Sequence, residues 1–316
     1  MTDKAHILTD KEIERMERHL SVIYARAEKD LTEKAEKYFA RFEKLDEQKR
    51  ALVDAGKMTE QEYKLWRQGK IMTGKHWQEM KAQAAQELLK VNETALEYVN
   101  GRLPKVYAIN YNHSAKEIEY LSKNAVSFEL INMGAVEELV KAGNKALLPK
   151  KKMNPAKDIP WNMKRVNSEV VQGIIQGESI PKIAKRIRNV TDSNKVSSVR
   201  AARTIVNTVE NKARHDAAEK AAEKGVVMGK CWIATFDSRT RDWHAQAWKD
   251  YGSKEDAIPI DDPFIVNGEE MMFPGDEAAS PANLYNCRCS HKNVVKGFTS
   301  ILPPEKRGKI KVSFVE

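Results

Sequence analysis

The sequence has few cysteines and no long apolar run. Its 316 residues include 3 cysteines, and none of its apolar stretches reaches the roughly 18 residues that a membrane-spanning helix needs. Charged residues are scattered through the first 20 positions, where a secretory signal peptide would be apolar. So few cysteines do not make a disulfide framework, which indicates a reducing compartment. We therefore expect a protein that is made in the cytoplasm and has no membrane partner.

Proline and glycine are absent from Thr9 to Gln48. Apolar residues recur there in steps of three and four, the spacing of one face of an amphipathic helix. Thr9 followed by Glu12 has the pattern of a capping box, in which a hydroxyl and a carboxylate satisfy free backbone amides at a helix start. This segment is therefore predicted to be one long helix that begins at Thr9.

More helices are predicted after it. Thr59 with Glu62 repeats the capping-box pattern, a third helix is expected over 73–104 until its glycine and proline end it, and a fourth over 114–144. Residues 1–148 are thus expected to form an extended all-helical region. A proline- and lysine-rich stretch that follows, without periodicity, marks a predicted boundary.

Positive charge is concentrated in the middle of the chain. Residues 149–228 contain 17 Lys and Arg against 8 Asp and Glu, whereas the blocks on either side are nearly balanced. Clustered positive charge favours a polyanion or an acidic partner surface, because phosphate contacts release counterions. The alternative is a solvated helix face. The candidate phosphate-contacting residues are Lys150, Lys151, Lys152, Lys182, Lys185, Arg186, Arg188, Arg200 and Arg203.

The character of the chain changes after this basic helical segment. A helix over 197–224 is expected, capped by Asp192 or Ser193 and ended by Gly225. The following VVMGKCWIATF has the composition of a strand, and prolines become frequent. The predicted fold class is α+β, with an extended helical N-terminal region, a helical middle segment and a small loop-rich α+β module over 229–316.

The first motif of this module is TFDSRTRDWHAQAW. Asp237 can cap the helix that follows, and Arg239 and Arg241 can clamp a carboxylate or phosphate. In a catalytic interpretation His244 is a general base. The interpretation that we favour is a structural network of cap and ion pairs.

The second motif, PFIVNGEEMMFPGD, is typical of a β-hairpin. Phe264–Val266 and Met271–Phe273 are the expected strands, and Asn267–Gly268 is the strongest short turn signal. Residues 274–276 are then a sharp turn rather than an acid catalyst.

The third motif, NLYNCRCSHK, alternates Cys287, Cys289 and His291. On an extended strand the three side chains face one way, and with His244 they make a candidate tetrahedral zinc set. The spacing favours buried or surface thiols without a metal instead, because zinc sites usually place about two to four residues between cysteines. We therefore expect no cofactor, and a bound zinc ion is the alternative.

Taken together and in this order, the three motifs resemble the phage Mu F-like head morphogenesis family, the minor head or minor capsid proteins of tailed phages. The resemblance covers roughly residues 165–295. The connection after the histidine, AQAWKDYGSKEDAIPIDD, is longer than is usual for the family. The motif positions in this chain are Asp237, Arg239, Thr240, Arg241, His244, Phe264, Gly268, Pro274, Gly275, Asp276, Asn286, Cys287, Arg288 and Cys289.

The resemblance implies a non-enzymatic protein inside the virion head, acting in head assembly at the portal vertex. Its implied partners are the portal protein, other capsid or scaffold proteins, and double-stranded DNA during packaging or ejection. The competing hypothesis is a metal-dependent nuclease or toxin-like enzyme built on Asp237, His244 and Asp276. No nucleophile elbow, phosphate loop or HExxH helix supports it.

Overall fold

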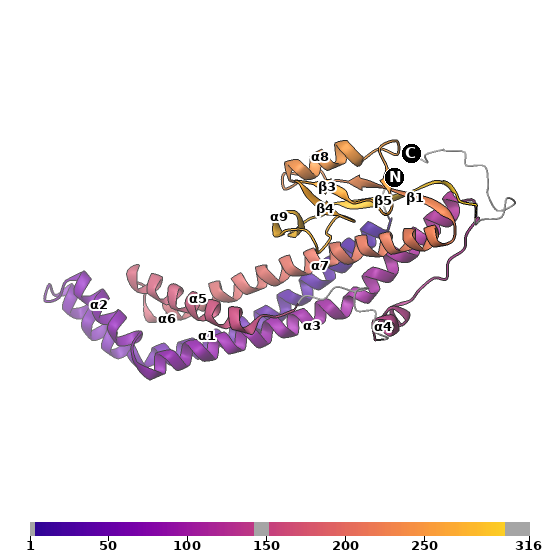
Figure 1. Ribbon diagram of the computed structural model, residues 1–316. Helices are drawn as coiled ribbons and strands as arrows, with labels where there is room; N and C mark the ends of the chain where they lie inside the picture. The colour runs from indigo at the N-terminus through magenta and orange to yellow at the C-terminus, as the bar shows by residue number, and fades with distance from the viewer. Residues whose placement is uncertain (1–3, 142–151, 301–316) are drawn as a thin grey trace. The chain divides into compact units, whose positions relative to one another are not determined.

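A computed structural model describes residues 4–141 and 152–300 of the chain (Figure 1). It confirms the α+β class with a large helical part. The elements in chain order are α1 (Lys4–Asp54), α2 (Glu60–Ile71), α3 (Gly74–Leu121), α4 (Met133–Lys141), α5 (Pro155–Ile175), α6 (Ile180–Lys185), α7 (Ile187–Glu223), β1 (Val226–Ile233), α8 (Asp242–Tyr251), β2 (Ile258–Pro259), β3 (Phe264–Val266), β4 (Glu269–Met271), α9 (Pro281–Leu284) and β5 (Ser290–Phe298).

The chain divides into two compact units, and each is assembled from separate stretches of sequence. Unit 1 contains Met1–Met16, Val99–Lys151 and Arg200–Glu316, and unit 2 contains Glu17–Tyr98 and Lys152–Val199. Helices α1, α3 and α7 continue from one unit into the other. The division into 1–148, 149–228 and 229–316 stays a prediction, and its first boundary lies outside the described residues.

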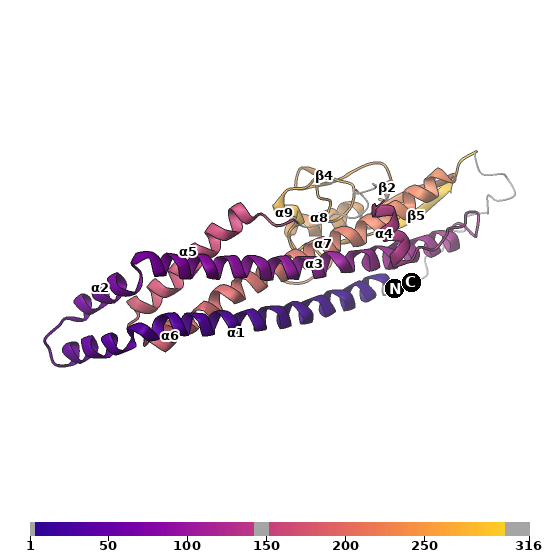
Figure 2. The same ribbon diagram turned by 90° about the horizontal axis from the view of Figure 1, so that it is seen from below.

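All of the regular secondary structure described in unit 2 is helical. The unit 2 parts of α1 and α3 lie side by side (Figure 2), and α2 connects them in sequence. Their apolar faces pack against α5 and α6. The resulting core contains Phe39, Trp77, Leu88, Val166 and Ile183. Burying aromatic and branched side chains of this size stabilises each by about 1.5–3 kcal/mol, so this core holds the helices together.

Unit 1 places a small sheet on a helix. β1 is the central strand, antiparallel to β2 on one side and β5 on the other. The sheet lies between α8 and the unit 1 part of α7 (Figure 1). Asn211 of α7 donates a hydrogen bond to the carbonyl of Cys289 at 3.1 Å, and Asn293 donates to the carbonyl of Arg214 at 2.8 Å. These buried contacts fix β5 and the loop before it on α7.

The predicted start of the first helix is wrong. Thr9 lies inside α1, where it is buried and accepts a hydrogen bond from Asn110 of α3 at 2.8 Å. Glu12 is also buried, and it accepts a hydrogen bond from Lys105 at 2.6 Å and pairs with Arg102. The capping-box pattern at Thr59 and Glu62, in contrast, is confirmed with both of its hydrogen bonds.

Two other helix boundaries are corrected. Pro104 was expected to end a helix but lies within α3, where burial of Leu103, Val106 and Tyr107 offsets the lost backbone hydrogen bond. The expected 114–144 helix is interrupted, because α3 ends at Leu121 and two residues with left-handed backbone follow.

The start of α7 is also earlier than expected. Asp192 and Ser193 lie inside this helix, and the Ser193 hydroxyl donates back to the carbonyl of Asn189. Its end near Gly225 is confirmed, where a φ of 90° suits glycine. Within the described ranges, no helix combines the length and apolar character that crossing a bilayer requires.

Candidate metal centre and motif residues

His244 enters the interior of unit 1 from the first turn of α8, and 2% of its surface is exposed. Its Nε2 lies 3.3 Å from Oδ1 of Asn283. The Asn283 amide is oriented by two further hydrogen bonds, since its Nδ2 donates to the carbonyl of Val266 and its Oδ1 accepts from Trp243. An amide oxygen only accepts, so Nε2 carries the ring proton and Nδ1 presents a lone pair.

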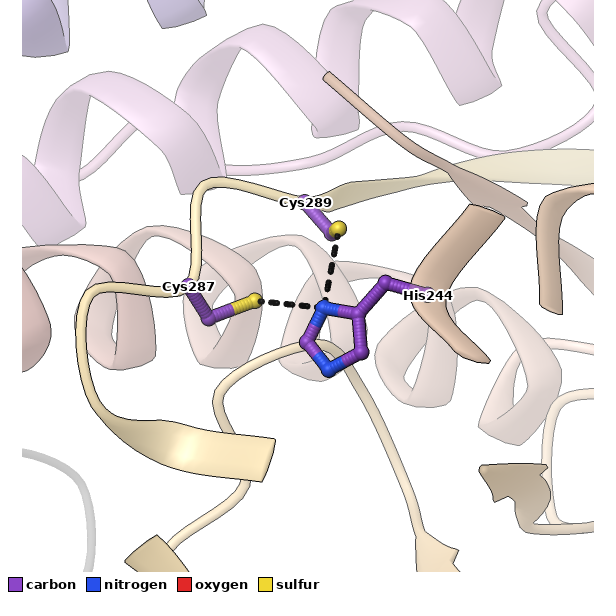
Figure 3. A group of neighbouring side chains, drawn as sticks. All are labelled: His244, Cys287 and Cys289. Atoms are coloured by element: carbon purple, nitrogen blue, oxygen red, sulfur yellow. Dashed lines mark hydrogen bonds between the residues drawn. The ribbon is translucent and has the colours of Figure 1, made fainter. Parts of the chain in front are cut away.

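Both neighbouring cysteines face this lone pair. The Sγ atoms of Cys287 and Cys289 lie 3.7 Å and 3.4 Å from Nδ1 of His244 (Figure 3). Both cysteines are buried, and their two sulfurs and Nδ1 all lie within 4.8 Å of one another. Three metal-ligand atoms therefore converge in the buried interior of unit 1.

The two thiols are electrostatically coupled. The contact with Cys289, together with burial, raises the pKa of Cys287 well above its usual range. The contact with Cys287 lowers the pKa of Cys289 to about 5, and the hydrogen bond with His244 acts in the same direction. The pair thus holds one proton far more tightly than the other.

His291, the fourth member of the expected zinc set, lies elsewhere. It is the second residue of β5, and its Nδ1 lies 3.2 Å from Oδ1 of Asn211 on α7. The expected alternation failed because β5 begins at Ser290, so Cys287 and Cys289 precede the regular strand. Asn286 before them has a left-handed backbone, which turns the chain.

The first motif forms a network of hydrogen bonds and ion pairs. Asp237 accepts from the backbone of Arg239 at 2.8 Å and pairs with Arg288 at 2.5 Å, and the Arg288 guanidinium holds the pKa of Asp237 well below its usual range. Thr240 donates to the carbonyl of Thr235. The helix cap expected of Asp237 is absent, since Arg241 occupies the N-cap of α8 and donates to the carbonyl of Tyr285.

The second motif is a hairpin, with a small correction to its return strand. Strand β3 pairs with β4 so that Phe264 faces Met271, and β4 spans Glu269–Met271 instead of 271–273. Asn267 and Gly268 both have positive φ, as a type I′ turn requires. Phe264 is fully buried and packs edge-on against Trp232.

The turn after the hairpin packs against α7. Gly275 has a φ of 83°, and its carbonyl accepts from Thr208 at 2.7 Å. Pro274 before it is buried. Asp276 accepts hydrogen bonds from the backbone amides of Met272 and Ala278, so both of its oxygens stabilise the turn.

The candidate DNA-binding residues differ in their exposure and in the ion pairs that they form. Lys150 and Lys151 lie outside the described residues, and Lys152, Lys182, Lys185 and Arg200 are exposed. Arg186 pairs with Glu178 and Glu169, and Arg188 with Glu28 and Asp192. Arg203 is partly buried. These ion pairs neutralise part of the positive charge that the composition indicated.

Two important residues escaped the sequence analysis, Asn283 and Asn211. Both are fully buried and hydrogen-bond to groups about 17 to 80 residues away. The one sequence signal for Asn283 is a polar residue flanked by apolar ones in PANL. Local periodicity does not reveal such partners, because their hydrogen bonds form only in the folded chain.

The comparison with family models agrees with the motifs. Residues 164–292 match the family model described as Phage Mu protein F like protein. A protein of Enterococcus faecalis named NAD(+)–arginine ADP-ribosyltransferase EFV is 27% identical over 217 residues, which cover 65% of this chain. The aligned part covers 43% of that relative's length. No solved structure matches.

The family match begins within α5, includes α6 and α7, and ends within β5, so it contains all three motifs. The family is one of phage head proteins, which agrees with a place in the virion head among other capsid proteins. The expected resemblance is confirmed over this part of the chain: residues 164–292 match the model of the phage Mu protein F-like family.

Proposed function

We propose that this protein is a minor head component that acts at the portal vertex during procapsid assembly and contacts DNA during packaging or ejection. The observation that carries the proposal is the family match over residues 164–292, which contain all three motifs. The proposal adds two partners to this match, the portal and DNA. The exposed lysines of the basic segment support the contact with DNA.

The hydrogen bonds of the motif residues support an architectural role rather than catalysis. Nε2 of His244 faces Asn283 and its Nδ1 faces the two cysteines, so neither ring nitrogen is available to a substrate. The oxygens of Asp237 and Asp276 accept hydrogen bonds from neighbouring protein groups. A general acid or base must reach the proton that it transfers, and these groups are already engaged.

The proposal is tested by inactivating the gene in a phage that encodes this chain and supplying the protein in trans. We expect defective or empty heads without it and normal, DNA-filled heads with it, as seen by electron microscopy of purified particles. Co-purification of the tagged chain with the portal ring tests its location. Normal numbers of filled, infectious heads in the absence of the protein contradict the proposal.

A second candidate is an enzyme that transfers ADP-ribose to arginine, as the name of the Enterococcus faecalis relative states for that protein. The aligned part covers less than half of the relative, so its activity need not reside in the shared part. Incubating the purified chain with labelled NAD⁺ and an arginine-rich acceptor distinguishes the two. We expect no transfer above the protein-free control, and stoichiometric labelling of the acceptor would favour the enzyme.

A further inference from the structure

We propose that His244, Cys287 and Cys289 bind one Zn²⁺ ion, which cross-links α8 to the loop that precedes β5. The ligand atoms are Nδ1 of His244 and the two sulfurs, and water completes a tetrahedron. This proposal is independent of the role in head assembly, since it rests on the interior of unit 1.

The spacing of the three atoms fits zinc. With bonds of about 2.0–2.1 Å to nitrogen and about 2.3 Å to sulfur, a tetrahedral site separates nitrogen from sulfur by roughly 3.6 Å. The two observed separations are 3.7 Å and 3.4 Å. A single Nδ1 lone pair accepts one thiol proton well, whereas a metal ion explains why two sulfurs converge on it.

The surroundings of His244 also fit a metal ligand. Metal-bound histidines almost always donate their second ring N–H to an oxygen, which fixes the tautomer. Asn283 provides that oxygen, and its own amide is held by the carbonyl of Val266 and the indole N–H of Trp243. The ring packs edge-on against Trp232, so its orientation is fixed on a second side.

The metal would stabilise the fold. His244 is separated from Cys287 by 43 residues and from Cys289 by 45. The intervening chain contains the β3–β4 hairpin and α9, whose few short elements give little local stability. Zn²⁺ binds both sulfurs as thiolates, so any thiol proton that the pair still holds is released to solvent. The ion joins the ends of this segment, so part of the binding free energy becomes folding free energy.

The test is metal analysis of the full chain purified under reducing conditions without chelators. We expect about one zinc per chain, a loss of at least tenfold in Cys287→Ser and Cys289→Ser, and full retention in Cys231→Ser. Cys231 is the matched control because it is equally buried but its thiol donates to the carbonyl of Ser253 at 3.0 Å. An equal loss in all three variants would overturn the proposal.

A second measurement keeps the test decisive if the ligand variants do not fold. The wild-type chain is stripped with a chelator and titrated with Co²⁺ under reducing conditions. We expect thiolate-to-cobalt charge-transfer and tetrahedral d–d absorption that saturate at one ion per chain and disappear on adding Zn²⁺. Wild-type protein that contains no zinc and gives no such spectrum overturns the proposal, and the cluster is then a hydrogen-bonded thiol pair.

Discussion

Asn283 sets the tautomer of His244, because its amide oxygen lies 3.3 Å from Nε2 and only accepts hydrogen bonds. The other ring nitrogen is thereby presented to Cys287 and Cys289. The uncharged side chain of Asn283, from α9, thus determines which nitrogen of His244 is available beside the two cysteines to bind a metal ion.

Replacing Asn283 with alanine should weaken zinc binding by about 10- to 100-fold, the usual cost of losing a partner of a metal-bound histidine. Asn283→Asp retains an acceptor oxygen for Nε2 but loses the donor to the carbonyl of Val266, so it should recover only part of the affinity. The measurement is competition with a chromophoric chelator at equilibrium. Equal affinities for the alanine variant and the wild type would show that the amide does not orient the imidazole toward a metal.

Two glycines with similar backbone differ in their surroundings, which makes them a matched pair. Gly275 has a φ of +83° and an added Cβ would lie 2.7 Å from Nδ2 of Asn207, whereas Gly268, with a φ of +75°, has open space around it. We expect Gly275→Ala to lower the free energy of unfolding by about 2–4 kcal/mol, through both strain and displacement of Asn207. Gly268→Ala should cost about 1–2 kcal/mol, from backbone strain alone.

Urea denaturation followed by tryptophan fluorescence measures this difference. Trp232 packs against Phe264 in the same interior, so it is the tryptophan, among 6 in the chain, whose emission depends on the hairpin. Equal destabilisation by the two variants would mean that the turn at Gly275 does not pack closely on α7.

His6 near the start of α1 makes the stability of unit 1 depend on pH. A hydrogen bond to the buried Glu210 at 2.9 Å raises the pKa of His6 from 6.5 to about 9. A raised pKa means that the folded state binds the proton more tightly. The stabilisation is therefore complete below pH 6.5 and is lost as pH rises through 9. It is no larger than about 3.5 kcal/mol, since one pKa unit corresponds to about 1.4 kcal/mol.

The comparison is between the wild type and His6→Gln in urea at several pH values. We expect the variant to be less stable at pH 6 and nearly equal at pH 10. The wild-type curve alone is insufficient, because burial lowers the pKa of Lys230 to about 8 and gives the opposite pH dependence. A difference that does not change with pH would contradict the link to His6.

Exposed lysines of the basic segment should set the salt dependence of DNA binding. Each phosphate contact contributes a slope of about −0.9 in log affinity against log salt. The double variant Lys182→Gln/Lys185→Gln should therefore reduce the magnitude of the slope by roughly two. Lys44→Gln/Lys249→Gln makes the same charge change at exposed positions outside the segment and should leave it unaltered. Binding that is absent or insensitive to salt would remove DNA from the proposed role.

Short-range signals predicted much of unit 1. The Asn267–Gly268 turn, the strand after Gly225 and the sharp turn at Gly275 all depend on backbone preferences of one or two residues, and all are present. The order of the motifs predicted the family. Three of the four residues in the expected zinc set also come together, because they occupy two of these motifs.

Helix ends and long-range partners were less predictable. Thr9 and Glu12 have the composition of a cap, but in the folded chain their side chains meet Asn110 and Lys105, roughly 90 to 100 residues away. The proline- and lysine-rich stretch that marks the predicted boundary also gives no sign that each unit joins separate stretches of sequence. Such features depend on tertiary packing, which overrides local propensity.

The central claim, that this chain is a structural part of the phage head, is tested most directly by quantitative mass spectrometry of purified procapsids and mature virions. The account predicts peptides of this chain in both particles, at a constant ratio to the portal protein. Particles that lack the chain, while it accumulates free in the lysate, would contradict the account.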